Sequence, residues 1–186
     1  MSDGAAGAAN TALVDASSAI LLHRAGLFAT VTAAYRVVMA ASVYTEVTAP
    51  GHHGAVAFGR FYREGRFVLE RPAQAGISDE GLPGGLHAGE RDTLLLYRGG
   101  CGDFIVIDDG KAAAHCRDAG IPYLNALLMP RVLHLSGCLS AEAGARAAKT
   151  ITDAGRYADW VVRYAREAAE AVLTPFLPAG PVDFSR

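Results

Sequence analysis

Short apolar runs alternate with helical spacings along most of the chain. Residues 11–15 are mainly apolar, include the β-branched Thr11 and Val14, and end in an acid, which predicts a short buried strand. Ser17 and Ser18 follow, and serine is a residue type that favours the start of a helix. The apolar positions beyond them continue to Leu27. The sequence therefore predicts a buried strand followed directly by a helix.

A second apolar run, residues 37–40, leads into a segment with the pattern of a short helix. Ser42 is the expected cap of this helix, and Glu46 lies within it. Pro50 and Gly51 then end the helix.

The same alternation continues to residue 135. The spacings predict a helix over 53–63, a strand over 66–69, a loop over 73–85, a helix over 89–97, a strand over 104–107, a helix over 111–119, a short edge strand over 121–124 and a helix over 126–135 that is interrupted near Pro130. Strands that alternate with helices are typical of an α/β fold with a mostly parallel sheet and helices on both faces.

The last third of the chain has a different composition. Residues 141–173 are rich in Ala, Arg and Glu, with apolar side chains at helical spacing, which predicts one or two amphipathic helices. Tyr157, Trp160 and Tyr164 fit helix packing better than base stacking. We expect a disordered tail over 1–10, a domain over 11–139, and a helical extension over 140–186 that packs on the domain or on a partner.

Composition and charge narrow the function. Hydrophobic residues make up 51% of the 186 residues and charged residues 19%, which is typical of a globular protein and not of a disordered one. The net charge of -2 lacks the basic excess of proteins that hold nucleic acid mainly through phosphate contacts. It does not argue against an enzyme that meets phosphate through a bound cation.

Three cysteines, Cys101, Cys116 and Cys138, are widely spaced and indicate neither a zinc site nor a disulfide framework. The chain has no apolar run of about 18 residues, the length of a membrane-spanning helix, and its start does not have the pattern of a secretory signal. The expectation is a cytoplasmic protein with no membrane contact.

Acidic residues occur where predicted strands end and where predicted helices begin. They are Asp15, Glu46, Glu90, Asp92, Asp108 and Asp109. In an open α/β sheet the carboxyl ends of the strands border the ligand crevice, so these acids are expected to converge. Carboxylates that share a site repel one another unless a cation neutralises them. Mg²⁺ or Mn²⁺ prefers such oxygen ligands and can activate water for attack on a phosphodiester.

Each acid taken alone also fits an ordinary structural role. Asp15 can cap the first helix, and Glu46 can be a solvated surface acid. Glu90 and Asp92 suit the first turn of a helix through its dipole, and Asp108 with its neighbours is a good turn sequence. Only the ordered combination favours a site.

The order of these segments resembles the PIN-domain family, in particular its VapC-like toxin ribonuclease branch and their uncharacterised bacterial relatives. The resemblance rests on residues 14–20, 43–47, 86–92 and 105–111, followed by 113–122, and it covers residues 12–139. It implies a three-layer, Rossmann-like fold. The implied activity is Mg²⁺- or Mn²⁺-dependent endonucleolytic cleavage of RNA, often with homodimerisation and inhibition by a partner antitoxin.

The resemblance also implies roles for individual residues. Asp15 is the first acid of the pocket and Glu46 the second. The third is Glu90 or Asp92, with Glu90 favoured, and the fourth is Asp108 or Asp109. The metal ligands are then Asp15, Glu46, Glu90 and Asp108, while Ser17 lies within hydrogen-bonding distance of an acid or of a metal-bound water.

The chain departs from the family pattern at Gly110, where relatives commonly have a basic residue. Lys111 is then the expected substrate contact, with Arg117 and Arg91 as further candidates for binding phosphate. Two alternative hypotheses stay open at this point. One is a non-catalytic PIN-like module that binds RNA or protein, and the other is a nuclease that cleaves DNA.

Overall fold

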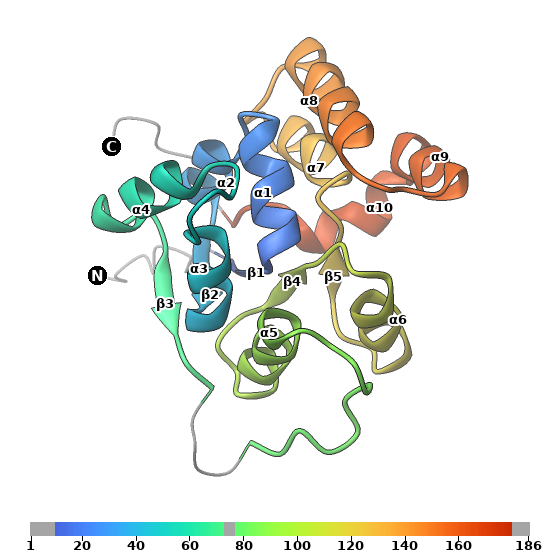
Figure 1. Ribbon diagram of the computed structural model, residues 1–186. Coiled ribbons are helices and arrows are strands. Elements are labelled where there is room, and N and C mark those ends of the chain that lie inside the picture. Colours follow the sequence, from blue (N-terminus) through green and yellow to red (C-terminus); the bar gives the residue numbers. More distant parts are fainter. Residues whose placement is uncertain (1–9, 73–76, 180–186) are drawn as a thin grey trace, which may run out of the picture.

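A computed structural model describes residues 10–72 and 77–179, and it shows a central sheet between two layers of helices (Figure 1). The strands are β1 (Thr11–Val14), β2 (Arg36–Ala40), β3 (Val68–Glu70), β4 (Phe104–Val106) and β5 (Tyr123–Leu124). The helices are α1 (Ala16–Arg24), α2 (Phe28–Ala34), α3 (Ala41–Val47), α4 (Ala55–Arg63), α5 (Ala88–Arg98), α6 (Gly110–Asp118), α7 (Met129–Leu135), α8 (Ala141–Ala154), α9 (Asp159–Glu167) and α10 (Glu170–Leu173), followed by the 3-10 turn η1 (Thr174–Phe176).

The five strands pair in the order β3-β2-β1-β4-β5, and all four pairings are parallel. The predicted α/β class is therefore confirmed, and β5 is the edge strand that the sequence indicated. After β1, the chain adds β2 and then β3 along one edge of β1. It then returns and adds β4 and β5 along the other edge of β1. This change of direction between β1 and β4 creates the position where α/β sheets bind their ligands.

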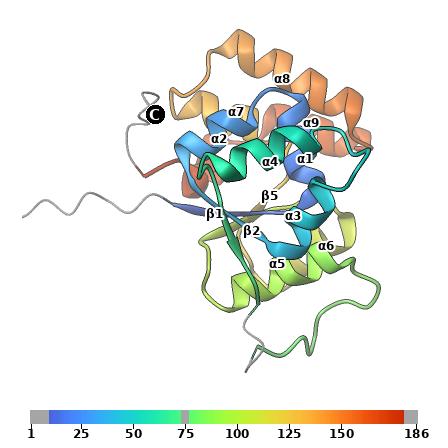
Figure 2. The same ribbon diagram turned by 60° about the vertical axis from the view of Figure 1, so that its left-hand side comes forward.

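Helices cover both faces of the sheet. Helices α1, α2, α4, α7 and α8 lie on one side, and α5 and α6 lie on the other (Figure 2). Helix α3 contacts both α1 and α5, so it bridges the two layers beside the carboxyl end of β2. The two helices that follow the neighbouring strands β1 and β4 thus lie on opposite faces, which opens a crevice between the ends of these strands.

The core consists of apolar strands that are buried on both faces, as expected for a parallel sheet. Every residue of β4 is buried, and so are three of the four residues of β1. Gly102 permits the close approach of the two strands, because a Cβ atom there would lie 2.7 Å from Cγ of Leu13. A rigid pair of strands therefore carries the acids that follow them.

The C-terminal extension folds back onto this domain. Helix α8 contacts α1 and α7. The hydroxyl of Tyr35 donates to the carbonyl of Phe176 at 2.7 Å, and the rings of Phe104 and Phe176 meet edge to face at 5.3 Å. The prediction of one or two helices was wrong, because α8 stops at Gly155, whose backbone is extended, and two further helices follow.

Three local predictions also differ from the structure. Helix α7 begins at Met129 and holds Pro130 in its first turn, where the missing N–H of proline costs nothing. The first predicted helix was expected to continue to Leu27 but ends at Arg24, since Gly26, with a φ of 72°, turns the chain, and α2 beyond it was not predicted. Ser42 does not cap α3, which begins at Ala41 with Ala40 as its N-cap and has no side-chain cap. Of the expected N-terminal tail and the loop over 73–85, residues 1–9 and 73–76 lie outside the described residues.

None of the helices in the described parts of the chain combines the length and the apolar character needed to cross a bilayer.

Candidate active site

Two acids stand side by side where β1 and β4 end. The strands pair with Val14 opposite Val106, and the backbone N–H of Asp15 donates to the carbonyl of Val106 at 3.1 Å. Asp108 follows β4 by two residues. The sheet therefore brings together the first and fourth acids of the predicted pocket.

Asp15 is held rigidly at the start of α1. It is the N-cap of that helix, and its Oδ1 accepts the backbone N–H of Ser18 at 2.8 Å. The hydroxyl of Ser17 donates to Oδ2 at 2.7 Å. Only 2% of the residue is exposed. Asp15 thus caps α1, the structural role that its sequence position allowed. The cap also fixes the direction in which the carboxylate points.

Asp108 receives hydrogen bonds from three separate segments. The hydroxyl of Ser18 donates to its Oδ2 at 2.6 Å, and the backbone N–H of Ala126 donates to the same oxygen at 3.0 Å. The hydroxyl of Tyr157 donates to Oδ1. Ser18 therefore links the two acids, with its amide on Asp15 and its hydroxyl on Asp108.

The electrostatics of this pair are unfavourable for two negative charges. Burial, and then the charge of Asp108, raise the pKa of Asp15 from 3.8 to about 7. Burial also raises the pKa of Asp108. Within residues 10–72 and 77–179 no ion pair involves either acid. The pair is thus desolvated without a compensating positive charge, a condition that often marks a functional site.

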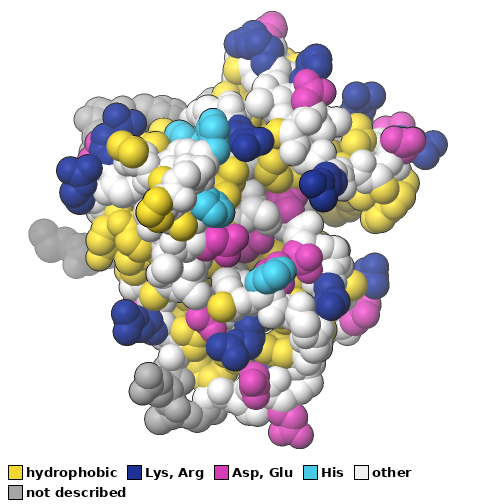
Figure 3. Space-filling model, viewed as in Figure 1, with side chains coloured by type: hydrophobic (Ala, Val, Ile, Leu, Met, Phe, Trp, Pro, Cys, Tyr) yellow, Lys and Arg dark blue, Asp and Glu magenta, His cyan; other side chains and the backbone are white. Residues whose placement is uncertain are grey.

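A small cavity of about 50 Å³ opens beside Asp15. Its lining side chains include Ser17, Glu46, His87 and Glu90. On the surface, acidic side chains gather near the middle of this face, with histidines beside them (Figure 3). The second and third predicted acids therefore border the same cavity as the first.

Close packing between α3 and α5 brings Glu46 to this cavity. A Cβ atom at Gly89 would lie 3.1 Å from Cγ2 of Val43 and 3.5 Å from Oε2 of Glu46. A larger residue at position 89 would have to push the side chain of Val43 aside, so glycine favours this close approach of α5 to α3. Glu46 itself is exposed, which leaves its carboxylate free to turn toward the cavity.

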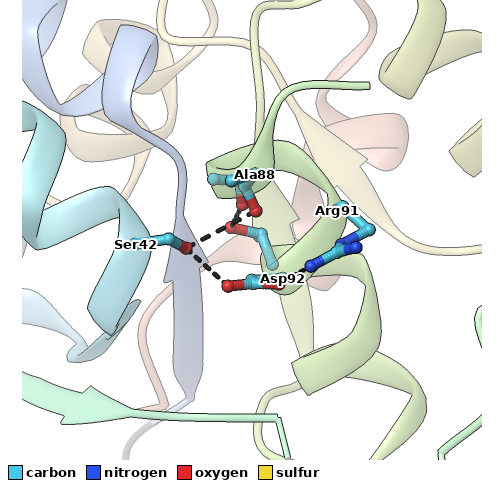
Figure 4. Close-up of polar contacts among 6 residues, drawn as sticks. Ser42, Ala88, Arg91 and Asp92 are labelled. Atoms are coloured by element: carbon cyan, nitrogen blue, oxygen red, sulfur yellow. Dashed lines mark hydrogen bonds and ion pairs between the residues drawn. The ribbon is translucent and has the colours of Figure 1, made fainter. Parts of the chain in front are cut away.

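The structure separates the two candidates for the third acid. Glu90 lines the cavity with Asp15, and its Oε2 accepts the backbone N–H of His87 at 2.9 Å. Asp92 does not line it and points toward α3, where its Oδ2 accepts the hydroxyl of Ser42 at 2.7 Å (Figure 4). Residues two apart on a helix face different ways, and only Glu90 faces the cavity with Asp15.

The two candidates for the fourth acid are also separated. Asp109 is the N-cap of α6, and its Oδ1 accepts the backbone N–H groups of Lys111 and Ala112 at 2.9 and 2.8 Å. Asp108 instead faces Asp15 through Ser18. The ammonium group of Lys111, the predicted substrate contact, donates to the carbonyl of Gly84 at 3.1 Å, and within residues 10–72 and 77–179 it forms no ion pair with the acids.

Sequence reasoning missed two residues of this site. Ser18 was visible as a target, because it is the third residue after the N-cap, the usual partner of a capping side chain. Tyr157 carried no such signal. It lies between α8 and α9 and packs against the core as expected, but its hydroxyl also reaches Asp108. Trp160 and Tyr164, in contrast, are not core residues, because their exposed fractions are 66% and 45%.

The donor chemistry of the site fits a hard divalent cation. The carboxylate oxygens of Asp15, Asp108, Glu46 and Glu90 are of the kind that Mg²⁺ and Mn²⁺ prefer, and the buried pair has no ion-pair partner among the described residues. In the part of the chain that the structure describes, however, no three His, Cys, Asp or Glu side chains are already placed to hold a metal ion.

A Rossmann-like parallel sheet with an acidic crevice at its switch point defines the class of this domain. Residues 11–135 match the family model DUF3368, described as a PIN domain, and the chain therefore belongs to the PIN-domain family. PIN domains are generally nucleases. No curated protein and no solved structure gave a significant match. Tyr157, which contacts Asp108, lies beyond the matched region.

Proposed function

We propose that the protein is a Mg²⁺- or Mn²⁺-dependent endoribonuclease that hydrolyses RNA phosphodiester bonds in this acidic crevice. The observation that carries the proposal is the pair Asp15 and Asp108, desolvated side by side at the carboxyl ends of β1 and β4 without a basic partner. Burying two such charges is costly unless a cation or a proton neutralises them. Membership of the PIN family supports the same activity.

The ion would be held by Asp15, Glu46, Glu90 and Asp108. When bound, it supplies Lewis-acid polarisation of the phosphodiester and a water of lowered pKa. Glu90 would exchange the backbone N–H of His87 for this role, and exposed Glu46 would rotate toward Asp15. These two short movements account for the absence of a preassembled group of three ligands among the described residues.

The residues around the acids set their orientation. Ser17 and Ser18 hold both oxygens of Asp15, and Tyr157 together with Ala126 holds Asp108. Carboxylates fixed in this way need no reorganisation when they bind a ligand, which is the condition for efficient electrostatic catalysis. With its pKa near 7 in the absence of an ion, Asp15 can be neutralised by a proton around neutral pH, and a bound cation would take the place of that proton.

The test is cleavage of a labelled single-stranded RNA by the purified chain with Mn²⁺. Asp15→Asn should abolish metal-dependent cleavage. Asp153→Asn is the matched control, because Asp153 pairs with Lys149 on the surface of α8. This variant should cleave the RNA at the wild-type rate. Unchanged cleavage by the Asp15→Asn variant would overturn the proposal. Parallel reactions with single-stranded and duplex DNA show whether RNA is the substrate.

The family resemblance adds a biological role to this proposal. The protein would act in the cytoplasm as the toxin of a toxin-antitoxin pair, as a homodimer that a partner antitoxin inhibits. Exposed Trp160 and Tyr164 on α9 offer an apolar surface for such protein contacts. Sedimentation velocity tests the dimer. Growth arrest on expression, relieved by a small DNA-binding protein encoded beside the gene, tests the toxin role.

A second candidate function is a non-catalytic module that binds RNA or protein. The observation that favours it is that no three ligands are in place among the described residues. Calorimetric titration with Mn²⁺ separates the two functions. The enzyme should bind the ion in a way that depends on Asp15, whereas the module should show no carboxylate-dependent binding.

A further inference from the structure

A second hollow has a volume of about 750 Å³. It is formed by the end of α1, the turn after α3, and α4. Its titratable lining residues are His23, His52, His53, Arg60 and Arg63, and we call it the histidine–arginine groove. None of the described residues that line it is acidic. Its volume is within the range of ligand-binding sites.

The groove concentrates positive charge that is only weakly compensated. Arg60 has one carboxylate neighbour, Glu64, at 3.7 Å, and such exposed pairs contribute little. The side chain of Arg63 donates to the carbonyl of Gly59 and has no ion pair among the described residues. The pKa of His23 is lowered by burial and then by the charges of His53 and Arg60. An anion placed in the groove would relieve this repulsion.

The turn that carries the histidines is seated closely on α1. Gly54 has a φ of 88°, and a Cβ atom there would lie 2.5 Å from Cδ2 of His23. This approach places the rings of His23 and His53 at 5.8 Å and those of His23 and Phe58 at 5.3 Å. Phe58 is buried, so the groove presents the imidazole rings of His23 and His53 beside its arginines, a combination suited to unstacked nucleotides.

Two helices connect the groove to the acidic cavity. Helix α1 has Asp15 at its start and His23 in its last turn, so eight residues, or roughly 12 Å along the helix axis, separate them. At the end of α3, Glu46 borders the cavity and Thr48 borders the groove. Acidic and histidine side chains also share one face of the molecule (Figure 3).

We propose that the histidine–arginine groove binds the phosphate backbone of single-stranded RNA and guides the strand into the acidic cavity. At a rise of roughly 3.4 Å or more per nucleotide, at most about four nucleotides of a single strand cover the roughly 12 Å. The small size of the cavity, about 50 Å³, favours a single strand over a duplex. The groove also supplies the basic contacts that Gly110 and Lys111 do not provide near the acids. The inference rests on the proposed ribonuclease function.

The experiment measures binding of a labelled single-stranded oligoribonucleotide to the full chain by fluorescence anisotropy, in EDTA so that no cleavage occurs. Affinity is recorded over a range of salt concentrations. The test variant is Arg60→Gln/Arg63→Gln. The control variant, Arg146→Gln/Arg163→Gln, removes the same net charge from exposed positions on α8 and α9. Thermal melts of both variants confirm that they are folded.

The test variant should lose affinity on the order of tenfold at 0.1 M salt, and its plot of log K against log salt should be shallower by about 1.4, at roughly 0.7 per phosphate contact. The control should keep the wild-type slope. Arg60→Lys/Arg63→Lys should restore most of the slope, because it restores the charge. Equal slopes for test and control variants would overturn the proposal, and so would equal binding of a duplex of the same sequence.

This outcome is independent of the cleavage assay. If Asp15→Asn abolishes cleavage while the arginine variant binds RNA normally, the groove assignment fails and the ribonuclease function stands. If the arginine variant loses RNA while Asp15→Asn still cleaves, the groove stands and the proposed catalytic site fails.

Discussion

Replacing Asp15 by Asn should make the protein more stable at pH 8 while it removes metal binding. The carboxylate is buried and close to Asp108, so its pKa is raised to about 7. The unfolded chain, with an ordinary pKa of 3.8, ionises the group freely. Asparagine caps a helix as well as aspartate does, and it can accept the backbone N–H of Ser18. The substitution thus removes the buried charge and keeps the cap.

The size of the effect follows from the difference between the two pKa values, which is about three. At roughly 1.4 kcal/mol per pKa unit, the ionised carboxylate lowers the free energy of unfolding by up to about 4 kcal/mol. Because the pKa is higher in the folded protein, this loss of stability is absent below pH 3.8 and complete only above pH 7. For a chain of this length, 2–4 kcal/mol corresponds to an increase in Tm of roughly 5–15 °C.

The assay is thermal or urea unfolding of the wild type and the Asp15→Asn variant at several pH values from 5 to 8, with and without Mn²⁺. The gain in stability should be largest at pH 8 and should shrink as the pH falls. Mn²⁺ should stabilise the wild type but not the Asp15→Asn variant. Asp153→Asn, on the surface of α8, should show no gain in stability at pH 8 and should be stabilised by Mn²⁺ as the wild type is. A variant that is less stable than the wild type at pH 8 would refute the reasoning.

Three further predictions concern individual contacts of the site. Tyr157→Phe removes one hydrogen-bond donor to Asp108 and should lower the free energy of unfolding by about 1 kcal/mol. Urea denaturation measures this change, and a variant as stable as the wild type would contradict the prediction. Glu90→Gln should weaken Mn²⁺ binding at least about tenfold, while Asp92→Asn should leave the Mn²⁺ affinity unchanged. Calorimetry measures both affinities, and a loss of affinity in Asp92→Asn but not in Glu90→Gln would assign the third acid to Asp92. Asp109→Ala should cost about 1 kcal/mol through the lost cap of α6 without changing Mn²⁺ affinity, and a matching loss of metal binding would show that Asp109 is a ligand.

The sequence by itself determined the class of the fold and the positions of the acids along the chain. Strands such as 11–15 and 104–107 are recognisable because apolar runs and turn glycines are local signals. The carboxyl ends of parallel strands lie at one edge of a sheet, and this rule places Asp15 near the pair Asp108 and Asp109 without deciding which of the two faces it. Local signals failed at Ser42 and Pro130, where packing and position within the helix decided the structure.

Only the tertiary structure decided which acids face the cavity. Glu90 and Asp92 have the same signal in the sequence, and the contact of α5 with α3 through Gly89 turns Glu90 toward Asp15 and leaves Asp92 to Ser42. Side-chain direction on a helix depends on which face the helix packs, and this is set by a partner far away in the chain.

The largest contribution of the tertiary structure is the contact between the C-terminal extension and the site. Ser18 and Asp108 meet across 90 residues of sequence, and Tyr157 reaches Asp108 across 49. Neither pair leaves a periodic signal, because hydrogen bonds between distant segments depend on how the layers stack and not on the neighbours of each residue. The sequence placed the acids in order, and the packing of helices around β1 and β4 determined how they are held.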